Sequence, residues 1–153
     1  MSQHDTDPQA LAEHSAAALY ATDRAAQELG MRVVAIAPEA ATVTMSVRPA
    51  MSNGHGICHG GMIFALADTA FAYACNSGGR ATVAAACSID FLAAAREGDL
   101  LSAAVRGVWH GGRSGLYEGV VTNQDGRQIA LFRGRSHRLA ERRTEDPAGR
   151  GHA

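Results

Sequence analysis

The chain has 153 residues, 46% of them hydrophobic and 19% charged, which is enough for one domain with a buried core. Its formal net charge of −1 gives no reason to expect nucleic acid or an acidic membrane as a partner. All 14 basic residues are arginine, which excludes chemistry that requires a lysine base or a lysine Schiff base.

The first half of the chain predicts a helical segment, two strands, a polar loop and an apolar helix, over residues 8–29, 33–37, 42–47, 53–61 and 60–77. Asp23 is a candidate N-cap, and Gly30 is a candidate C-cap. The apolar helix is expected to end at Gly78 and Gly79.

The second half predicts four strands separated by turn-forming residues, over residues 81–92, 100–110, 114–123 and 127–138. This order predicts an α+β fold, in which an antiparallel sheet of five to six strands wraps around one central helix. We expect a single domain over residues 1–139, including an N-terminal helical segment over 1–30. The charged tail over 140–153 contains Pro and Gly and is expected to be disordered.

Cysteine usage and the N-terminal segment indicate the compartment. Cys58, Cys75 and Cys87 are an odd number without CxxC spacing, so they predict no disulfide framework. The polar N-terminus lacks the basic and apolar regions of a signal peptide. The apolar helix is too short to span a bilayer, so we expect a cytoplasmic protein with no membrane partner.

The apolar run from Met62 to Cys75 contains one ionisable carboxylate, Asp68. Because burial of an unpaired carboxylate is costly, this residue is expected to have either a partner or a chemical role. It is a candidate nucleophile or a candidate general base that activates water. Thr69, which follows it, could hold the water or orient the carboxylate, or could bond only to the helix backbone.

The loop before this helix is the second candidate for chemistry. A helix that begins near Gly60 presents unsatisfied N–H groups, and glycine lets a ligand approach them closely. Such an N–H can stabilise the negative charge that develops on a carbonyl oxygen during acyl transfer. Asn53 could bind a thioester, its sulfur or the water, and a simple turn residue is an equal alternative. His59 is expected to orient the loop.

His55, Cys58 and His59 superficially resemble zinc ligands. Three ligands within five residues and no fourth make a poor tetrahedral site, so no metal is predicted. Cys58 as a nucleophile beside His59 is a second alternative, although most free cysteines are inert and packed. Near the last strand, the alternating residues 133–138 could meet phosphates, but an outward-facing strand surface accounts for them better.

Gly60 and Asp68 are eight residues apart, which is ~12 Å along a helix that rises 1.5 Å per residue. One carbonyl group cannot occupy both places. If both residues act on one substrate, the aspartate must come from another subunit. A two-fold dimer with antiparallel central helices would provide this arrangement, with two shared active sites.

Residues 53–77 read N-G-H-x-x-C-H-G-G-x-x-F-x-L-A-D-T-A-F-A-Y-A-C-N-S, which strongly resembles the PaaI-type thioesterases of the hotdog-fold superfamily. Similarity continues through C-S-I-D-F-L and A-L-F-R-G-R-S-H-R, over 87–92 and 130–138. The resemblance implies a hotdog fold, a homodimer that commonly pairs into a homotetramer, and no metal or cofactor.

The implied activity is hydrolysis of phenylacetyl- or hydroxyphenylacetyl-coenzyme A, as in phenylacetate degradation. By resemblance, Asp68 is the catalytic carboxylate and Gly60 polarises the thioester carbonyl. Asn53, His59 and Thr69 match the other catalytic positions. Residues 91–96 depart from the family pattern, because an Arg-Pro pair often follows F-L there. A non-catalytic acyl-CoA sensor and a hotdog acyl-thioester hydratase or dehydratase are the alternatives.

Overall fold

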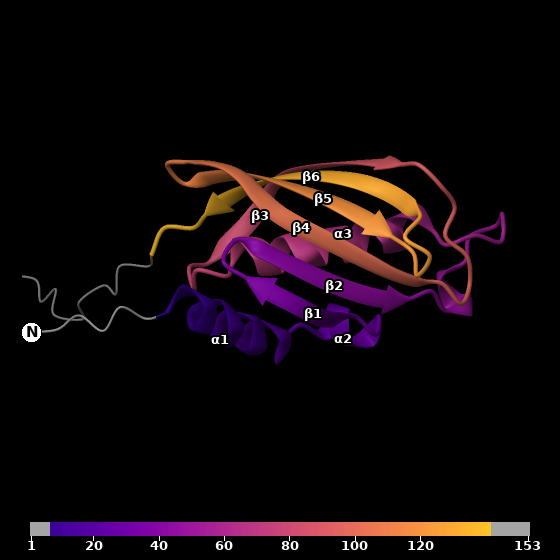
Figure 1. Cartoon of the computed structure of the whole chain (residues 1–153), viewed down its shortest axis with the longest axis horizontal. Coiled ribbons are helices and arrows are strands. Elements are labelled where there is room, and N and C mark those ends of the chain that lie inside the picture. The colour runs from indigo at the N-terminus through magenta and orange to yellow at the C-terminus, as the bar shows by residue number, and fades with distance from the viewer. Residues whose placement is uncertain (1–6, 142–153) are drawn as a thin grey trace, which may run out of the picture.

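The protein forms one six-stranded antiparallel sheet that wraps around a central helix, in a computed structural model that describes residues 7–141 (Figure 1). Its α helices are α1 (Pro8–Tyr20), α2 (Arg24–Glu28) and α3 (Gly60–Cys75), with a 3-10 turn η1 (Pro49–Met51). Its strands are β1 (Arg32–Ala37), β2 (Ala40–Ser46), β3 (Thr82–Phe91), β4 (Leu100–Gly111), β5 (Ser114–Thr122) and β6 (Gln128–Arg138).

The strands lie in the order β1-β2-β4-β5-β6-β3, and α3 packs against the inner face of the sheet. Leu66, Ala70 and Phe71 of α3 are fully buried, together with inward-facing Val43 of β2 and Leu101 of β4. The alternating burial along β2 and β6 is the two-residue period of a strand with one buried face. The predicted sheet around a single helix is therefore confirmed, with six strands.

The N-terminal helical segment differs in detail from the sequence expectation. It forms two helices instead of one, because Asp23 lies between them and its carboxylate accepts a hydrogen bond from the backbone N–H of Ala26 at 3.1 Å. The predicted N-cap is thereby confirmed. Gly30 follows α2 with a φ of 67°, the left-handed conformation expected of a residue that ends a helix.

Helix α3 ends two residues earlier than predicted, at Cys75, and its end is joined to the start of β3. The Asn76 side chain donates to the carbonyls of Ala72 and Thr82, at 2.8 and 2.9 Å, and accepts from the Thr82 N–H. Within residues 7–141, no helix has both the length and the apolar composition needed to cross a membrane. The tail predicted to be disordered covers residues 140–153, and most of it, residues 142–153, lies outside the described residues.

The two edges of the sheet differ. The β1 edge is covered by α1, whose Gln9 side chain donates to the Ile36 carbonyl at 2.9 Å. The β3 edge has β6 on one side and, within residues 7–141, no strand on the other. An open edge of ten residues is a ready template for pairing with another chain.

Candidate active site

The first turn of α3 presents a backbone N–H that has no acceptor within residues 7–141. His59 is the N-cap of the helix, and its Nδ1 accepts a hydrogen bond from the Gly61 N–H at 3.0 Å. The Gly60 N–H, directly before it, makes no hydrogen bond among the described residues. Because N–H groups at a helix start also carry the positive end of the helix dipole, this donor is suited to an electronegative oxygen.

The loop that leads into α3 is held in place by backbone and side-chain hydrogen bonds. Oδ1 of Asn53 accepts from the N–H groups of His55 and Ile57, at 2.9 and 3.3 Å, so the turn role considered for this residue is observed. The same bonds leave the Asn53 Nδ2 without an acceptor among residues 7–141. The loop ends where the Cys58 N–H donates to the Ala95 carbonyl at 2.8 Å.

A cavity of about 360 Å³ opens beside this loop and the start of α3. Its lining is mainly apolar: Ile57, Cys58, Ile63, Phe91, Leu92 and Ala93–Ala95, with Asn53 and Gly60. Phe91 lies closest to the helix start, because a Cβ at position 60 would come within 3.1 Å of its ring. The absence of a side chain at Gly60 therefore leaves room for both the Phe91 ring and a ligand.

Asp68 lies two turns further along α3 and is half-buried. Burial raises the pKa of its carboxyl above the usual value. The Cys87 thiol on β3 lies beside it, with its Sγ 4.0 Å from Oδ1. Within residues 7–141 this carboxylate forms no ion pair, and with its raised pKa it is suited to accepting a proton.

Thr69 follows Asp68, and its hydroxyl donates to the carbonyl of Ala65 at 2.7 Å. This is the backbone-bonded geometry considered from the sequence. The hydroxyl oxygen can still accept a hydrogen bond, because its own proton is the one donated to Ala65.

Gly60 and Asp68 lie on one continuous helix, as predicted. Their separation along the axis is therefore ~12 Å, which is too large for one carbonyl group to contact both within a chain. The five candidate residues thus form two groups. Asn53, His59 and Gly60 surround the start of α3, whereas Asp68 and Thr69 lie near its middle.

Cys58 is buried, and its burial and the nearby Asp99 raise the pKa of its thiol. The protonated thiol is a poor nucleophile, which argues against the alternative that pairs it with His59. Among residues 7–141, His, Cys, Asp and Glu side chains form no group of three or more arranged to hold a metal ion.

Comparisons with known proteins identify the family of this chain. The profile of the thioesterase superfamily matches residues 55–130, which include α3 and most of the sheet. The acyl-coenzyme A thioesterase PaaI of Escherichia coli K12 is 48% identical over 125 residues, which span 82% of this chain and 89% of that protein. The chain belongs to the PaaI-type thioesterases.

Solved structures agree with this membership. The E. coli PaaI structure superposes with a TM-score of 0.86, at 46% identity, over 88% of this chain and 97% of that one. A point mutant of the phenylacetic acid degradation protein PaaI from Thermus thermophilus matches with a TM-score of 0.73 at 36% identity. The match covers 76% of this chain and 100% of that one. A hypothetical thioesterase from Streptococcus pneumoniae, solved with coenzyme A, matches at 25% identity with a TM-score of 0.69. The match covers 74% of this chain and 88% of that one.

The predictions of a hotdog fold and of an acyl-CoA thioesterase are therefore confirmed. The sequence reasoning missed two neighbours of the candidate residues, Phe91 beside Gly60 and Cys87 beside Asp68. Both lie on β3, and no local pattern could have placed them against α3. In the sequence, Cys87 and Phe91 are marked only by the resemblance of residues 87–92 to the family. That resemblance does not predict which residues they contact.

Proposed function

We propose that this thioesterase acts on arylacetyl-coenzyme A thioesters, with phenylacetyl- and hydroxyphenylacetyl-coenzyme A as preferred substrates. The observation that carries the proposal is the available Gly60 N–H at the mouth of an apolar cavity lined by Phe91 and Ile63. Such a lining suits a planar aromatic group, while the N–H suits the adjacent carbonyl oxygen. Similarity to the phenylacetic acid degradation protein PaaI of Thermus thermophilus supports the same substrate class.

In the proposed reaction, the Gly60 N–H and the Asn53 amide donate to the thioester oxygen, on which negative charge develops. Asp68 takes a proton from water, the water oxygen bonds to the carbonyl carbon, and the carbon–sulfur bond then breaks. The coenzyme A thiolate leaves and is protonated. Alternatively, Asp68 attacks the carbonyl itself and water hydrolyses the resulting anhydride. His59 is a positioning residue, because its Nδ1 holds the Gly61 N–H.

We propose that Asp68 of one chain lies opposite Gly60 of its partner, because the two residues are ~12 Å apart along one helix. Two surfaces support this homodimer. The first is the open β3 edge, and the second is a stripe of incompletely buried residues along α3, formed by Gly61, Ala65, Asp68 and Ala72 at helical spacing. Because Asp68 lies next to Cys87 of β3, the stripe borders that edge. A second copy docked there would cover both surfaces.

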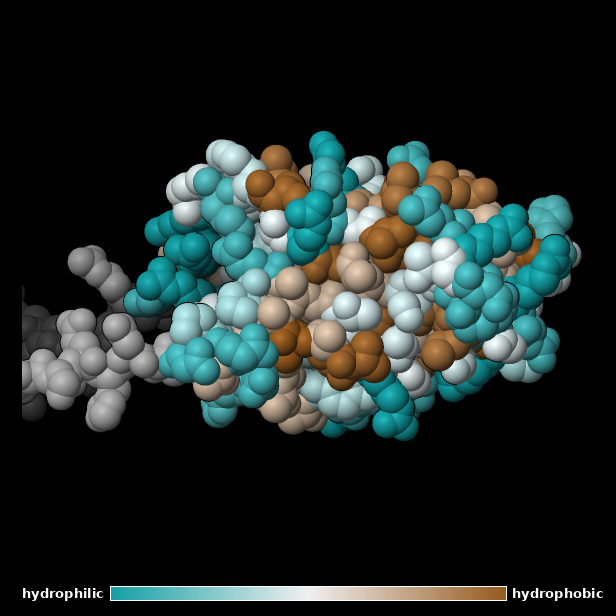
Figure 2. Space-filling model, viewed as in Figure 1, coloured by the Kyte–Doolittle hydropathy of each residue, from teal (hydrophilic) through white to brown (hydrophobic). Residues whose placement is uncertain are grey.

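Pairing of two dimers into a homotetramer is part of the same proposal. Figure 2 shows apolar side chains among polar ones on the outer face of the sheet. On this face a groove is lined by residues that include Ala35, Ala104, Val120 and Leu131. Sedimentation of the purified protein tests the assembly.

A cytoplasmic location, which the three free cysteines support, also stays a prediction.

The shared site is tested by mixing two inactive variants, Asp68→Asn and Gly60→Pro. A heterodimer of the two contains one site with intact Gly60 and Asp68, and one site that has lost both. We expect it to regain about half of the wild-type turnover per dimer, as two-fold symmetry requires. Turnover of tagged, co-purified heterodimers measures this. Heterodimers as inactive as either parent would show that each site lies within one chain.

The acyl preference is tested with a panel of phenylacetyl-, hydroxyphenylacetyl-, benzoyl-, acetyl- and octanoyl-coenzyme A, with release of free thiol as the readout. We expect kcat/KM for the two arylacetyl thioesters to exceed that for the aliphatic ones by about tenfold or more, as apolar pockets of matched shape achieve. A higher kcat/KM for octanoyl- or acetyl-coenzyme A would contradict the arylacetyl assignment. The assignment of the protein as a thioesterase would be unaffected by that result.

A further inference from the structure

A second cavity, of about 240 Å³, lies at the C-terminal end of α3, at the opposite end of the helix from Gly60. It is enclosed by the start of α1, the β1–β2 turn, the β4–β5 hairpin and the end of β6. A cavity needs roughly 10–15 Å³ to hold one water molecule, so this cavity has room for a group of several atoms. The mechanism proposed above uses no part of it.

Three arginines from three separate segments line this cavity: Arg80 after α3, Arg113 in the β4–β5 turn and Arg138 at the end of β6. Within residues 7–141, no carboxylate lies within 4 Å of any of their guanidinium groups. The outward-facing surface expected for 133–138 is correct for Arg133, Arg135 and His137, which are exposed. Arg138 differs, because it is partly buried and faces the cavity.

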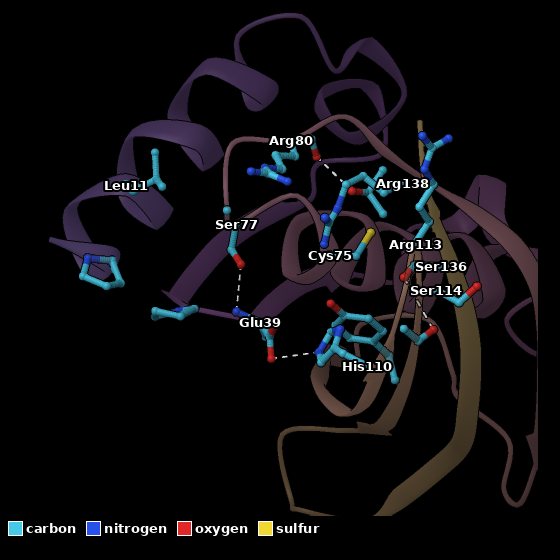
Figure 3. Close-up of a pocket in the computed structure, with 16 residues that line it drawn as sticks. Leu11, Glu39, Cys75, Ser77, Arg80, His110, Arg113, Ser114, Ser136 and Arg138 are labelled. Carbon is cyan, nitrogen blue, oxygen red and sulfur yellow. Dashed lines mark hydrogen bonds and ion pairs between the residues drawn. The ribbon is translucent and has the colours of Figure 1, made fainter. Parts of the chain in front are cut away.

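Among residues 7–141, Glu39 is the one carboxylate in the lining of this cavity, and that group is already engaged. Its Oε2 lies 2.9 Å from Nε2 of His110. Figure 3 shows Glu39 and His110 together on one side, below the labelled positions of Arg80, Arg113 and Arg138. The arginines therefore outnumber the carboxylate, and the cavity attracts anions.

The wall also contains a tyrosine, Tyr117, whose hydroxyl has no hydrogen-bond partner among the described residues. Tyr117 is only 2% exposed, and its hydroxyl makes no hydrogen bond within residues 7–141, although the ring packs against Phe71 and His110. Within residues 7–141 no fully buried side-chain N or O atom lacks a hydrogen-bond partner, so this hydroxyl is not fully buried, and Tyr117 lines the cavity. A hydroxyl that reaches a cavity in this way is free to hydrogen-bond to a ligand or to water.

The backbone of the wall is held in a strained conformation. Glu39 has a φ of 61°, which is uncommon for a residue other than glycine. Its N–H donates to the Ser77 hydroxyl at 2.7 Å, and its carbonyl accepts from the Gly107 N–H at 2.8 Å. These bonds fix the turn that carries Glu39 opposite the arginines. Strain maintained in this way is typical of sites with a function.

We propose that this cavity binds a phosphate group through Arg80, Arg113 and Arg138, with the Tyr117 hydroxyl as a further donor. Guanidinium groups recognise phosphate oxygens by paired, charge-assisted hydrogen bonds. Three guanidinium groups match the two negative charges of a phosphate better than the single charge of a carboxylate. The phosphate belongs either to coenzyme A or to a separate small phosphate compound. The binding site itself does not depend on the proposed acyl preference or on the shared active site.

The direct test is titration calorimetry of the full chain with inorganic phosphate and with adenosine 3′,5′-bisphosphate. We expect at least one of the two to bind, and Arg113→Gln and Arg138→Gln each to weaken binding about tenfold or more, as loss of a charge-assisted bond does. Tyr117→Phe keeps the ring packing and is expected to weaken binding about threefold to tenfold. The matched control is Arg127→Gln, an exposed arginine in another turn, which is expected to bind as wild type does.

Steady-state kinetics separates the two sources of phosphate. A raised KM for acyl-coenzyme A in Arg113→Gln, with kcat retained, would assign the phosphate to the substrate. An unchanged KM, together with weakened binding of inorganic phosphate, would assign it to a separate compound. The proposal is wrong if neither ligand binds the wild-type protein, or if the arginine and tyrosine variants bind as tightly as Arg127→Gln. Because binding is measured directly, this result is independent of which thioester the enzyme prefers.

Discussion

Replacement of Asp68 by asparagine is expected to lower kcat by about 10²- to 10⁴-fold, the usual contribution of a positioned base. The amide keeps the size of the side chain but can neither accept the proton of water nor attack a carbonyl carbon. Thiol release from phenylacetyl-coenzyme A measures the loss. Asp125→Asn, an exposed carboxylate in the β5–β6 turn, is the matched control and is expected to retain full turnover. Full turnover in Asp68→Asn would remove this residue from the mechanism.

The same variant is expected to be at least as stable as the wild type. Burial raises the pKa of Asp68, which means that the folded protein disfavours the charged carboxylate relative to the unfolded chain. An uncharged amide avoids that cost, so the melting temperature should stay level or rise. A clear fall in melting temperature would instead assign the lost turnover to damaged folding.

The raised pKa also sets the direction of the pH dependence. Both proposed roles of Asp68 need the carboxylate, so wild-type kcat is expected to fall as the pH drops through the raised pKa. A single turnover in oxygen-labelled water tests the nucleophilic role. Label found in Asp68 indicates a covalent anhydride that water opens at the aspartyl carbon, and it counts against simple base catalysis.

Replacement of Gly60 by proline is expected to lower kcat by about 10²- to 10³-fold, as does removal of one oxyanion donor in other acyl-transfer enzymes. Proline removes the N–H without breaking a helix hydrogen bond, because the first position of a helix has no intrahelical acceptor for it. It also adds a Cβ within 3.1 Å of the Phe91 ring. His59 already has the extended backbone, with a ψ of 133°, that a residue before proline requires. The helix should therefore remain intact.

Gly60→Ala is the matched control, because it adds a Cβ and keeps the N–H. That Cβ comes within 3.1 Å of the Phe91 ring, which is 52% exposed and can move aside. We therefore expect a moderate rise in KM with most of kcat retained. If alanine reduces kcat as strongly as proline does, crowding of the cavity and not loss of the donor explains the effect.

Local patterns in the sequence were sufficient for the helix that carries the candidate residues. The apolar run after Gly60 predicts one continuous α3, and the fixed rise of a helix then separates Gly60 from Asp68 by ~12 Å. The N-cap at Asp23 and the strand periods were also predictable, because each depends on neighbours within a few residues. The sequence predicts one helical segment where the structure has α1 and α2, because alanine favours helix on both sides of the break.

The sequence by itself determined the candidate catalytic residues, the helix that spaces them and the family to which the chain belongs. Only the tertiary structure decided what lies beside them: Phe91 over Gly60, Cys87 against Asp68, and the open edge of β3. It also brought Arg80, Arg113 and Arg138 around one cavity. The physical reason is that helix spacing is a local property of the backbone, whereas these contacts depend on strand order, which pairs segments far apart in the chain.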